Sequence, residues 1–219
     1  MKFSEIKSAS SKQWLARQHR DPYVKKAHQD GYRSRAAFKI LEIDKKFNIF
    51  KEVSRIVELG AAPGGWTQVV SQKLNEKLNS GEAKMAAVDL LSFAPLPNIY
   101  QIIGDFEDDA VKTKIVKFFE NQPADLILSD MAPSTTGHAP TDHLKIMRLV
   151  EDAYGFAQEF LADGGAFVAK IFHGADEKKF VDELRRNFSK VSYFKPDSSR
   201  SMSVEIYIIA TGFKKCQQK

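Results

Sequence analysis

The chain has 219 residues, 43% of them hydrophobic, and a formal net charge of +5, which suits one α/β domain with a single core. It has no stretch near the roughly 20 apolar residues of a membrane span and no signal peptide at its N-terminus, so we expect a cytoplasmic protein without membrane contact. Cys216 is the only cysteine, which excludes an internal disulfide and a thiolate metal site.

The positive charge is concentrated at the N-terminal end. Residues 1–39 hold ten Lys or Arg and three acidic residues, a local charge of +7, whereas the rest of the chain has a net charge of −2. Trp14, Tyr23 and Tyr32 lie among these basic residues. Basic and aromatic side chains together suit a phosphate backbone and unstacked bases. We therefore predict a nucleic-acid-binding arm over residues 1–32, with a merely solvated tail as the alternative.

Helix-like and strand-like segments alternate after the arm. An amphipathic pattern predicts a helix over residues 34–48. Strands are predicted at 54–60, 84–90, 98–105, 124–130, 165–172, 190–195 and 204–211. Helices are predicted at 65–78, 109–121, 143–161 and 176–188. This alternation indicates a doubly covered, mostly parallel sheet of Rossmann-like α/β type.

The last connection of the chain breaks the alternation. Only "PDSSRSMS" separates the final two predicted strands, which is too short for a parallel crossover. We therefore predict a seven-stranded sheet whose last strand is antiparallel, in a single domain over residues 33–213. A polar tail over residues 214–219 follows.

A small-residue loop follows the first predicted strand, in "IVELGAAPGGWTQVV" at residues 56–70. The Walker pattern fits at Gly60, Gly65 and Thr67, but Trp66 stands where the lysine belongs. The dinucleotide fingerprint fails because Ala62 replaces its second glycine. The loop thus resembles a nucleotide site that lacks the charge for a triphosphate, and this disfavours a nucleotide hydrolase or an NAD enzyme without excluding either.

Three of the following strands end at an aspartate, namely Asp89, Asp105 and Asp130. In open parallel sheets, ligands bind beyond the carboxyl ends of the strands. Asp89 could accept hydrogen bonds from ribose hydroxyls and Asp105 could reach the base, while the loop and helix N-terminus offer N–H groups to a carboxylate. S-adenosylmethionine combines these features with a cationic centre. The alternative is that the aspartates are turn residues or helix caps.

Two charged residues lie inside apolar strand segments. Lys170 is central in "GAFVAKIF" and Glu205 lies in "VEIYIIA". An unpaired buried ammonium is costly, so one explanation is a purely structural Lys170–Glu205 ion pair. With Asp130 at a neighbouring strand end, Lys170 is also a candidate base. His138 and His143 complete no zinc spacing, and we expect no metal.

Several segments resemble the FtsJ/RrmJ family of RNA ribose 2′-O-methyltransferases. They are "SRAAFK", "LGAAPGGWTQ", "SDMAP", "VAKIF" and "SVEIYIIATG", and the resemblance extends over about residues 8–212. It places the family's Lys-Asp-Lys-Glu tetrad at Lys39, Asp130, Lys170 and Glu205, where we assign Lys170 as proton acceptor. Taken alone, Lys39 is typical of a solvated helix lysine. Together with the loop, the resemblance implies that S-adenosylmethionine is bound by Gly60, Gly64, Gly65, Trp66, Asp89, Asp105 and Asp130.

The resemblance also suggests a substrate. In its segment "KPDSSR" and in having no extra domain, the chain most resembles the family's bacterial members that act on large-subunit ribosomal RNA. They imply methylation of a uridine ribose of 23S rRNA on the 50S subunit, by a monomer. Family members that modify tRNA or mRNA caps share the tetrad, so these substrates remain alternatives. A catalytically silent ribosome-assembly factor is another.

Overall fold

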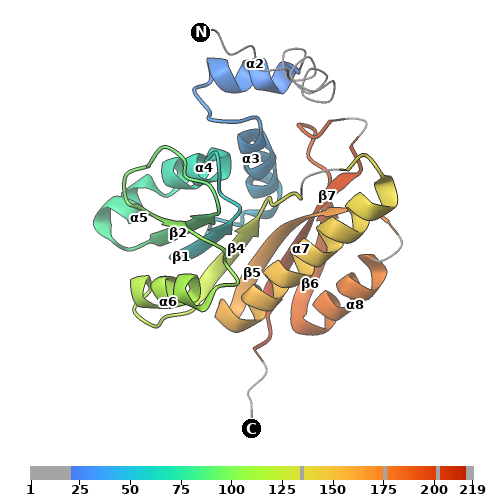
Figure 1. The fold of residues 1–219 in the computed structure, drawn as a ribbon. Coiled ribbons are helices and arrows are strands. Elements are labelled where there is room, and N and C mark those ends of the chain that lie inside the picture. Colours follow the sequence, from blue (N-terminus) through green and yellow to red (C-terminus); the bar gives the residue numbers. More distant parts are fainter. Residues whose placement is uncertain (1–20, 134–135, 175–176, 201–202, 216–219) are drawn as a thin grey trace, which may run out of the picture.

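The computed structural model describes residues 21–133, 136–174, 177–200 and 203–215. Its centre is a seven-stranded sheet with the strand order β3-β2-β1-β4-β5-β7-β6 (Figure 1). Strand β7 runs antiparallel to both of its neighbours, and the other neighbouring pairs are parallel. This confirms the predicted mostly parallel sheet with a reversed last strand. The strands are β1 (Arg55–Leu59), β2 (Lys84–Asp89), β3 (Ile99–Ile103), β4 (Ala124–Ser129), β5 (Leu161–Phe172), β6 (Phe188–Phe194) and β7 (Glu205–Phe213).

Helices cover both faces of the sheet, as Figure 1 shows. One face is covered by α6 (Asp109–Phe118), α7 (Ala139–Phe160) and α8 (Glu177–Asn187). The other is covered by α3 (Ala36–Phe47), α4 (Gly65–Lys73) and α5 (Asn75–Ser80). None of the described helices is both long enough and apolar enough to cross a membrane.

The observed helices differ most from the sequence prediction at two points. The helix expected over residues 65–78 is divided at Leu74, whose φ of −109° and ψ of 20° end α4 before α5 begins. Helix α7 begins at Ala139 instead of residue 143. Its first turn contains Pro140, which fits there because the first amides of a helix have no partner within it.

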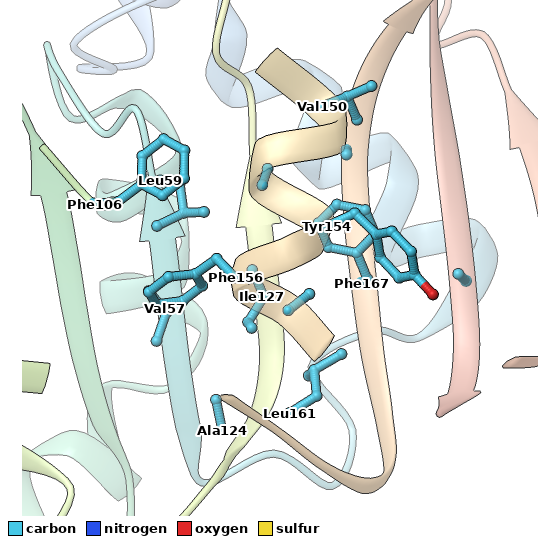
Figure 2. Close-up of a cluster of buried hydrophobic side chains, with 14 of the residues drawn as sticks. Val57, Leu59, Phe106, Ala124, Ile127, Val150, Tyr154, Phe156, Leu161 and Phe167 are labelled. Carbon is cyan, nitrogen blue, oxygen red and sulfur yellow. The ribbon is translucent and has the colours of Figure 1, made fainter. Parts of the chain in front are cut away.

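The larger hydrophobic cluster lies between the sheet and α7. Figure 2 shows Val57, Ile127 and Phe167 of the sheet beside Tyr154 and Phe156 of the helix. Full burial of such side chains contributes about 1.5–3 kcal/mol each. The cluster therefore fixes β4 and β5, the strands that lead to Asp130 and carry Lys170.

The second cluster lies between the sheet and α3 and α4, and it explains where the charged residues emerge. Leu128 and Val168 are buried in it. Because side chains alternate along a strand, the residues two positions later lie on the same face of the sheet. These residues are Asp130 and Lys170, so the sheet places both under α3, which carries Lys39.

The described part of the predicted arm is folded onto this body. Helix α2 (Pro22–Gln29) is capped by Asp21, whose Oδ1 accepts a hydrogen bond from the Tyr23 amide at 3.0 Å. The rings of Tyr23 and Tyr32 each lie 5.5 Å from that of Phe38 in α3. Two of the three aromatic residues proposed for base stacking are thus partly buried against α3. Trp14 and the rest of residues 1–20 lie outside the described chain.

Candidate active site

The four residues of the predicted tetrad converge from different elements. Lys39 comes from α3, Asp130 follows β4, Lys170 lies in β5, and Glu205 begins β7. Their side chains are only 7–16% exposed. Lys39, which taken alone predicted a solvated lysine, is therefore buried. The structure brings together all four residues that the resemblance suggested.

The charges within the tetrad form two close ion pairs and a third, longer one between Lys39 and Asp130. Lys170 Nζ lies 3.1 Å from Asp130 Oδ1 and donates to the Asp130 carbonyl oxygen at 2.7 Å. Lys39 Nζ lies 2.7 Å from Glu205 Oε1 and 4.0 Å from Asp130 Oδ1. Nζ has three positions beyond its bond to the side chain, and two of them face Asp130, so Lys170 keeps one position for a substrate hydroxyl.

The structural Lys170–Glu205 pair that we considered from sequence is not the pairing observed. Lys170 lies opposite Tyr207 in the β5–β7 ladder, whereas Glu205 lies opposite Phe172. Lys170 and Glu205 are therefore diagonal neighbours, which lie farther apart than directly opposed residues. Each pairs instead with a residue from another element.

Tyr207 is a member of the site that sequence reasoning missed. Its hydroxyl donates to Asp130 Oδ1 at 2.6 Å, and its buried ring lies 5.6 Å from Lys39 Nζ. A tyrosine in an apolar strand is usually a core residue, so the sequence offered no reason to predict Tyr207 as a site residue. The available signal was its place two residues after Glu205, since this spacing puts both side chains on one face.

The environment shifts the pKa of two of these groups. Burial raises the pKa of Asp130, but the charges of Lys170 and Lys39 and the Tyr207 hydrogen bond outweigh it and leave the pKa below its ordinary value. Burial, together with the nearby carboxylates of Asp130 and Glu205, raises the pKa of Tyr207 well above its ordinary value. At neutral pH Asp130 is therefore ionised and Tyr207 remains a donor to it.

The glycines of the loop are needed for close approach and for unusual backbone angles. Gly60 and Gly64 have φ values of +75° and +97°, which other residues rarely adopt. A Cβ on Gly60 would lie closer than 3.0 Å to Met131, and one on Gly65 closer than 3.0 Å to the Ser34 hydroxyl. The loop thus brings the N-terminus of α4, with its free amides, to the carboxyl edge of the sheet.

A cavity of about 900 Å³ opens at this edge. Four of the predicted cofactor residues line it, and they are Gly60, Asp89, Asp105 and Asp130. Val88, Leu90, Phe106 and Met131 are among its apolar wall residues. A cavity with apolar walls and a few carboxylates is typical of a site for a small polar ligand.

The remaining three predicted cofactor residues, Gly64, Gly65 and Trp66, do not line this cavity. The Trp66 indole is 2% exposed, and its Nε1 donates to the Ala36 carbonyl at 2.9 Å. It also lies 5.7 Å from the Tyr207 ring. Any contact of Trp66 with a cofactor must therefore use its backbone, because its side chain is buried against Tyr207, next to the tetrad.

The aspartates at the strand ends also hold the local backbone. The Asp89 carboxylate accepts hydrogen bonds from the Ala62 and Leu91 amides, both at 2.8 Å. Asp105 Oδ1 accepts one from the Glu107 amide at 3.0 Å. A carboxylate accepts about four hydrogen bonds, so these turn contacts leave acceptor sites that face the cavity.

In the part of the chain that the structure describes, no cluster of three or more His, Cys, Asp or Glu could hold a metal ion.

Comparison with known proteins identifies the fold and the family. A family model described as FtsJ-like methyltransferase matches residues 32–213. The chain belongs to this family. It is an enzyme of the methyltransferase class, as the resemblance predicted.

Individual FtsJ-like relatives resemble the chain over nearly its full length. A protein of Paramagnetospirillum magneticum named ribosomal RNA large subunit methyltransferase E is 47% identical over 98% of this chain and 87% of its own length. A protein of the same name from Granulibacter bethesdensis is 46% identical over 98% of this chain and 90% of its own length. A solved structure from Plasmodium falciparum, described as a ribosomal RNA methyltransferase, is 29% identical with a TM-score of 0.73, and covers 83% of this chain and 98% of its own.

Proposed function

We propose that the protein transfers a methyl group from S-adenosylmethionine to the 2′-oxygen of a ribose in large-subunit ribosomal RNA. The observation that carries the proposal is the double role of Asp130. This residue lines the cavity at the strand ends and also binds Lys170 at 3.1 Å. A methyl donor in the cavity and a hydroxyl at Lys170 would therefore meet at one side chain.

The cavity fits S-adenosylmethionine by the chemistry of its walls. Asp89 and Asp105 offer acceptors for the ribose hydroxyls and the adenine amine, and the apolar residues suit the faces of the base. The amides at the start of α4 do not line the cavity, but they follow directly on the loop whose Gly60 and Ala62 do, and they suit the carboxylate of the amino acid part. The acidic side chains favour a cationic ligand and disfavour a triphosphate. When bound, S-adenosylmethionine supplies an electrophilic methyl group.

The tetrad would prepare the nucleophile. The 2′-oxygen would form the new bond to the methyl carbon as the sulfur–carbon bond breaks and S-adenosylhomocysteine leaves. The hydroxyl proton would pass to the lone pair of Lys170 Nζ, which must be a neutral amine to accept it and becomes an ammonium. A positioned base contributes roughly 10²–10⁴-fold in rate. Asp130 orients the Lys170 amino group through two contacts, while Lys39 and Glu205 surround the developing charge. If Lys170 keeps its proton throughout, its contribution is instead to orient the hydroxyl and stabilise the developing oxyanion.

The substrate assignment is supported by two observations of different kinds. The relatives described above are named as methyltransferases of large-subunit ribosomal RNA. The chain also has five basic residues and one acidic residue within its first twenty, a suitable composition for an RNA-binding arm. We propose a uridine of 23S rRNA in the 50S subunit as the target, and a monomeric cytoplasmic enzyme as its catalyst.

The experiment is a methyl-transfer assay with labelled S-adenosylmethionine. Purified protein is incubated with 50S subunits from cells that lack it, with free 23S rRNA, or with tRNA, and each RNA is digested to nucleosides. We expect the label as 2′-O-methyluridine from the 50S subunit. Label on a base or only in tRNA would contradict the proposal, and failure to transfer methyl to any RNA would support a silent assembly factor.

A further inference from the structure

The connection between β6 and β7 is held against helix α3. The Glu42 carboxylate accepts hydrogen bonds from the Asp197 amide at 2.6 Å and the Ser198 amide at 3.1 Å. Arg35, at the start of α3, donates from Nη2 to the Ser198 carbonyl oxygen. These contacts join parts of the chain that lie more than 150 residues apart in sequence. They fix the backbone at Asp197 and Ser198.

A second set of contacts ties the same connection to the N-terminal side of the body. The buried Asp21 carboxylate accepts from Arg35 Nη1 and from Arg200 Nε, the latter at 3.0 Å. Asp21 also caps α2. We refer to Asp21, Arg35 and Arg200 as the arginine clamp. A buried carboxylate with two guanidinium partners holds both of them in fixed orientations.

The residue between these two anchors contacts the tetrad. Ser199 is 8% exposed, and its hydroxyl donates to Glu205 Oε1 at 2.9 Å. The same oxygen lies 2.7 Å from Lys39 Nζ. Glu205 Oε1 therefore has two donors, one from α3 and one from the clamped connection.

The neighbouring serine provides a contrast within the same segment. Ser198 is fully buried, yet within the described chain its hydroxyl has no hydrogen-bond partner. The two serines are adjacent and both buried, and they differ in whether the hydroxyl contacts Glu205. A comparison of alanine substitutions at the two serines therefore separates the effect of the Ser199–Glu205 hydrogen bond from the effect of removing a buried hydroxyl.

We propose that Ser199, held in place by the arginine clamp, is a positioning residue that fixes the Glu205–Lys39 pair for methyl transfer. Lys39 Nζ lies at the edge of ion-pair distance from Asp130, at 4.0 Å, so a small rotation of Glu205 changes the charge around Asp130. Reaction rates respond strongly to displacements of this size. The proposal rests on the methyltransferase function proposed above and assigns no contact between Ser199 and the substrate.

The test compares Ser199→Ala with Ser198→Ala in single-turnover methyl transfer to 50S subunits. For Ser199→Ala we expect a rate lower by roughly 10-fold, with the Kd for S-adenosylmethionine unchanged. We expect Ser198→Ala to match the wild type in both, and Ser199→Thr, which keeps the hydroxyl, to restore most of the rate. Equal rates for the two alanine variants, or a Ser199→Thr variant as slow as Ser199→Ala, would overturn the proposal.

The clamp is tested with a pair of charge-matched variants at the two ends of α2. Asp21→Asn keeps a capping oxygen but loses the charge that holds the arginines. Asp30→Asn removes the same charge from an exposed ion pair with Lys26. We expect Asp21→Asn to slow methyl transfer and Asp30→Asn to leave its rate unchanged. The double variant Asp21→Asn with Ser199→Ala should be only slightly slower than Ser199→Ala alone, because both substitutions affect the same Ser199–Glu205 contact. Full additivity of Asp21→Asn and Ser199→Ala would overturn the connection between them.

The proposed function and the positioning role fail in different ways. A wild-type protein that transfers no methyl group to RNA would refute the proposed function. An active wild type with equally active serine variants would refute only the positioning role. Thermal unfolding of each variant accompanies the assay, and if Asp21→Asn is unfolded at the assay temperature, the serine comparison alone decides.

Discussion

Asp130 and Glu58 are carboxylic acids on the same face of the sheet, but their pKa values shift in opposite directions. Asp130 has two lysines and a tyrosine hydroxyl around it, and its pKa is lowered in spite of burial. Glu58 is 2% exposed, and its Oε2 accepts from the Thr67 hydroxyl at 2.6 Å. Burial raises the pKa of Glu58 to about 8, with the Thr67 hydrogen bond opposing the shift. Glu58 is therefore a protonated core residue at neutral pH.

The raised pKa of Glu58 predicts a pH dependence of stability. The folded state keeps a proton that the unfolded state releases above pH 4.5, so the free energy of unfolding falls between about pH 4.5 and 8. The slope reaches at most about 1.4 kcal/mol per pH unit. Chemical denaturation of the wild type and of Glu58→Gln, whose amide cannot titrate, measures it. We expect the wild type to lose stability relative to the variant over this range, and parallel profiles would refute the assignment.

Sequence indicated which residues meet at the tetrad, but it did not indicate in which direction the Trp66 side chain points. Lys170 and Glu205 stood out as charged residues in apolar strands and Asp130 as an acid at a strand end, but only the family resemblance placed Lys39 with them. The resemblance implied Trp66 as a cofactor-binding residue, and the structure shows its indole buried, with Nε1 donating to the Ala36 carbonyl. The direction of a side chain at the start of a helix depends on which helix packs above it, here α3. No local pattern contains that information.

At the scale of elements, the strands were predictable and their long-range contacts were not. Each predicted strand is present, because runs of apolar residues end sharply at Asp89, Asp130 and similar positions. The reversed β7 followed from the length of its connection. The clamp joins Asp21 to Arg200, which lie 179 residues apart in sequence. Such a contact depends on the completed fold, so neither spacing nor composition could predict it.

The contacts of α2 also change the interpretation of the N-terminal arm. Its residues from Asp21 onward contribute to the folded body, because Asp21 holds two arginines and Ala27 is buried. The RNA-binding proposal therefore concerns residues 1–20, which carry a net charge of +4. A truncation that extends into α2 would remove the clamp as well as the charge, and its effects could not be assigned to either.

At the scale of the whole molecule, the concentration of positive charge at the N-terminal end predicts that residues 1–20 contribute to RNA binding in a salt-dependent way. Deletion of residues 1–20 is expected to weaken RNA binding. It should also reduce the slope of log K against log salt by roughly 0.7 for each phosphate that the arm neutralises in the wild type. Binding isotherms at several salt concentrations measure both quantities. An unchanged slope would show that the segment is only a solvated tail.

The control removes an equal charge from a remote surface. Helix α8 carries four exposed basic residues, which neutral glutamines can replace without touching the cavity or the tetrad, and these are Lys178, Lys179, Arg185 and Arg186. This variant also loses a net charge of +4. We expect this variant to retain a steeper slope of log K against log salt than the truncated protein, because the slope depends on the contacts of the arm with RNA and not on net charge alone.

The central claim is that Lys170 accepts the proton of the ribose hydroxyl, and the most direct measurement is single-turnover methyl transfer by Lys170→Arg and Lys170→Ala. Arginine places a permanent positive charge beside Asp130 and cannot act as a base. We predict that both variants bind S-adenosylmethionine with unchanged Kd and lose at least about 10²-fold in transfer rate. Substantial turnover by Lys170→Arg would contradict this claim and leave Lys170 only an orienting, electrostatic role.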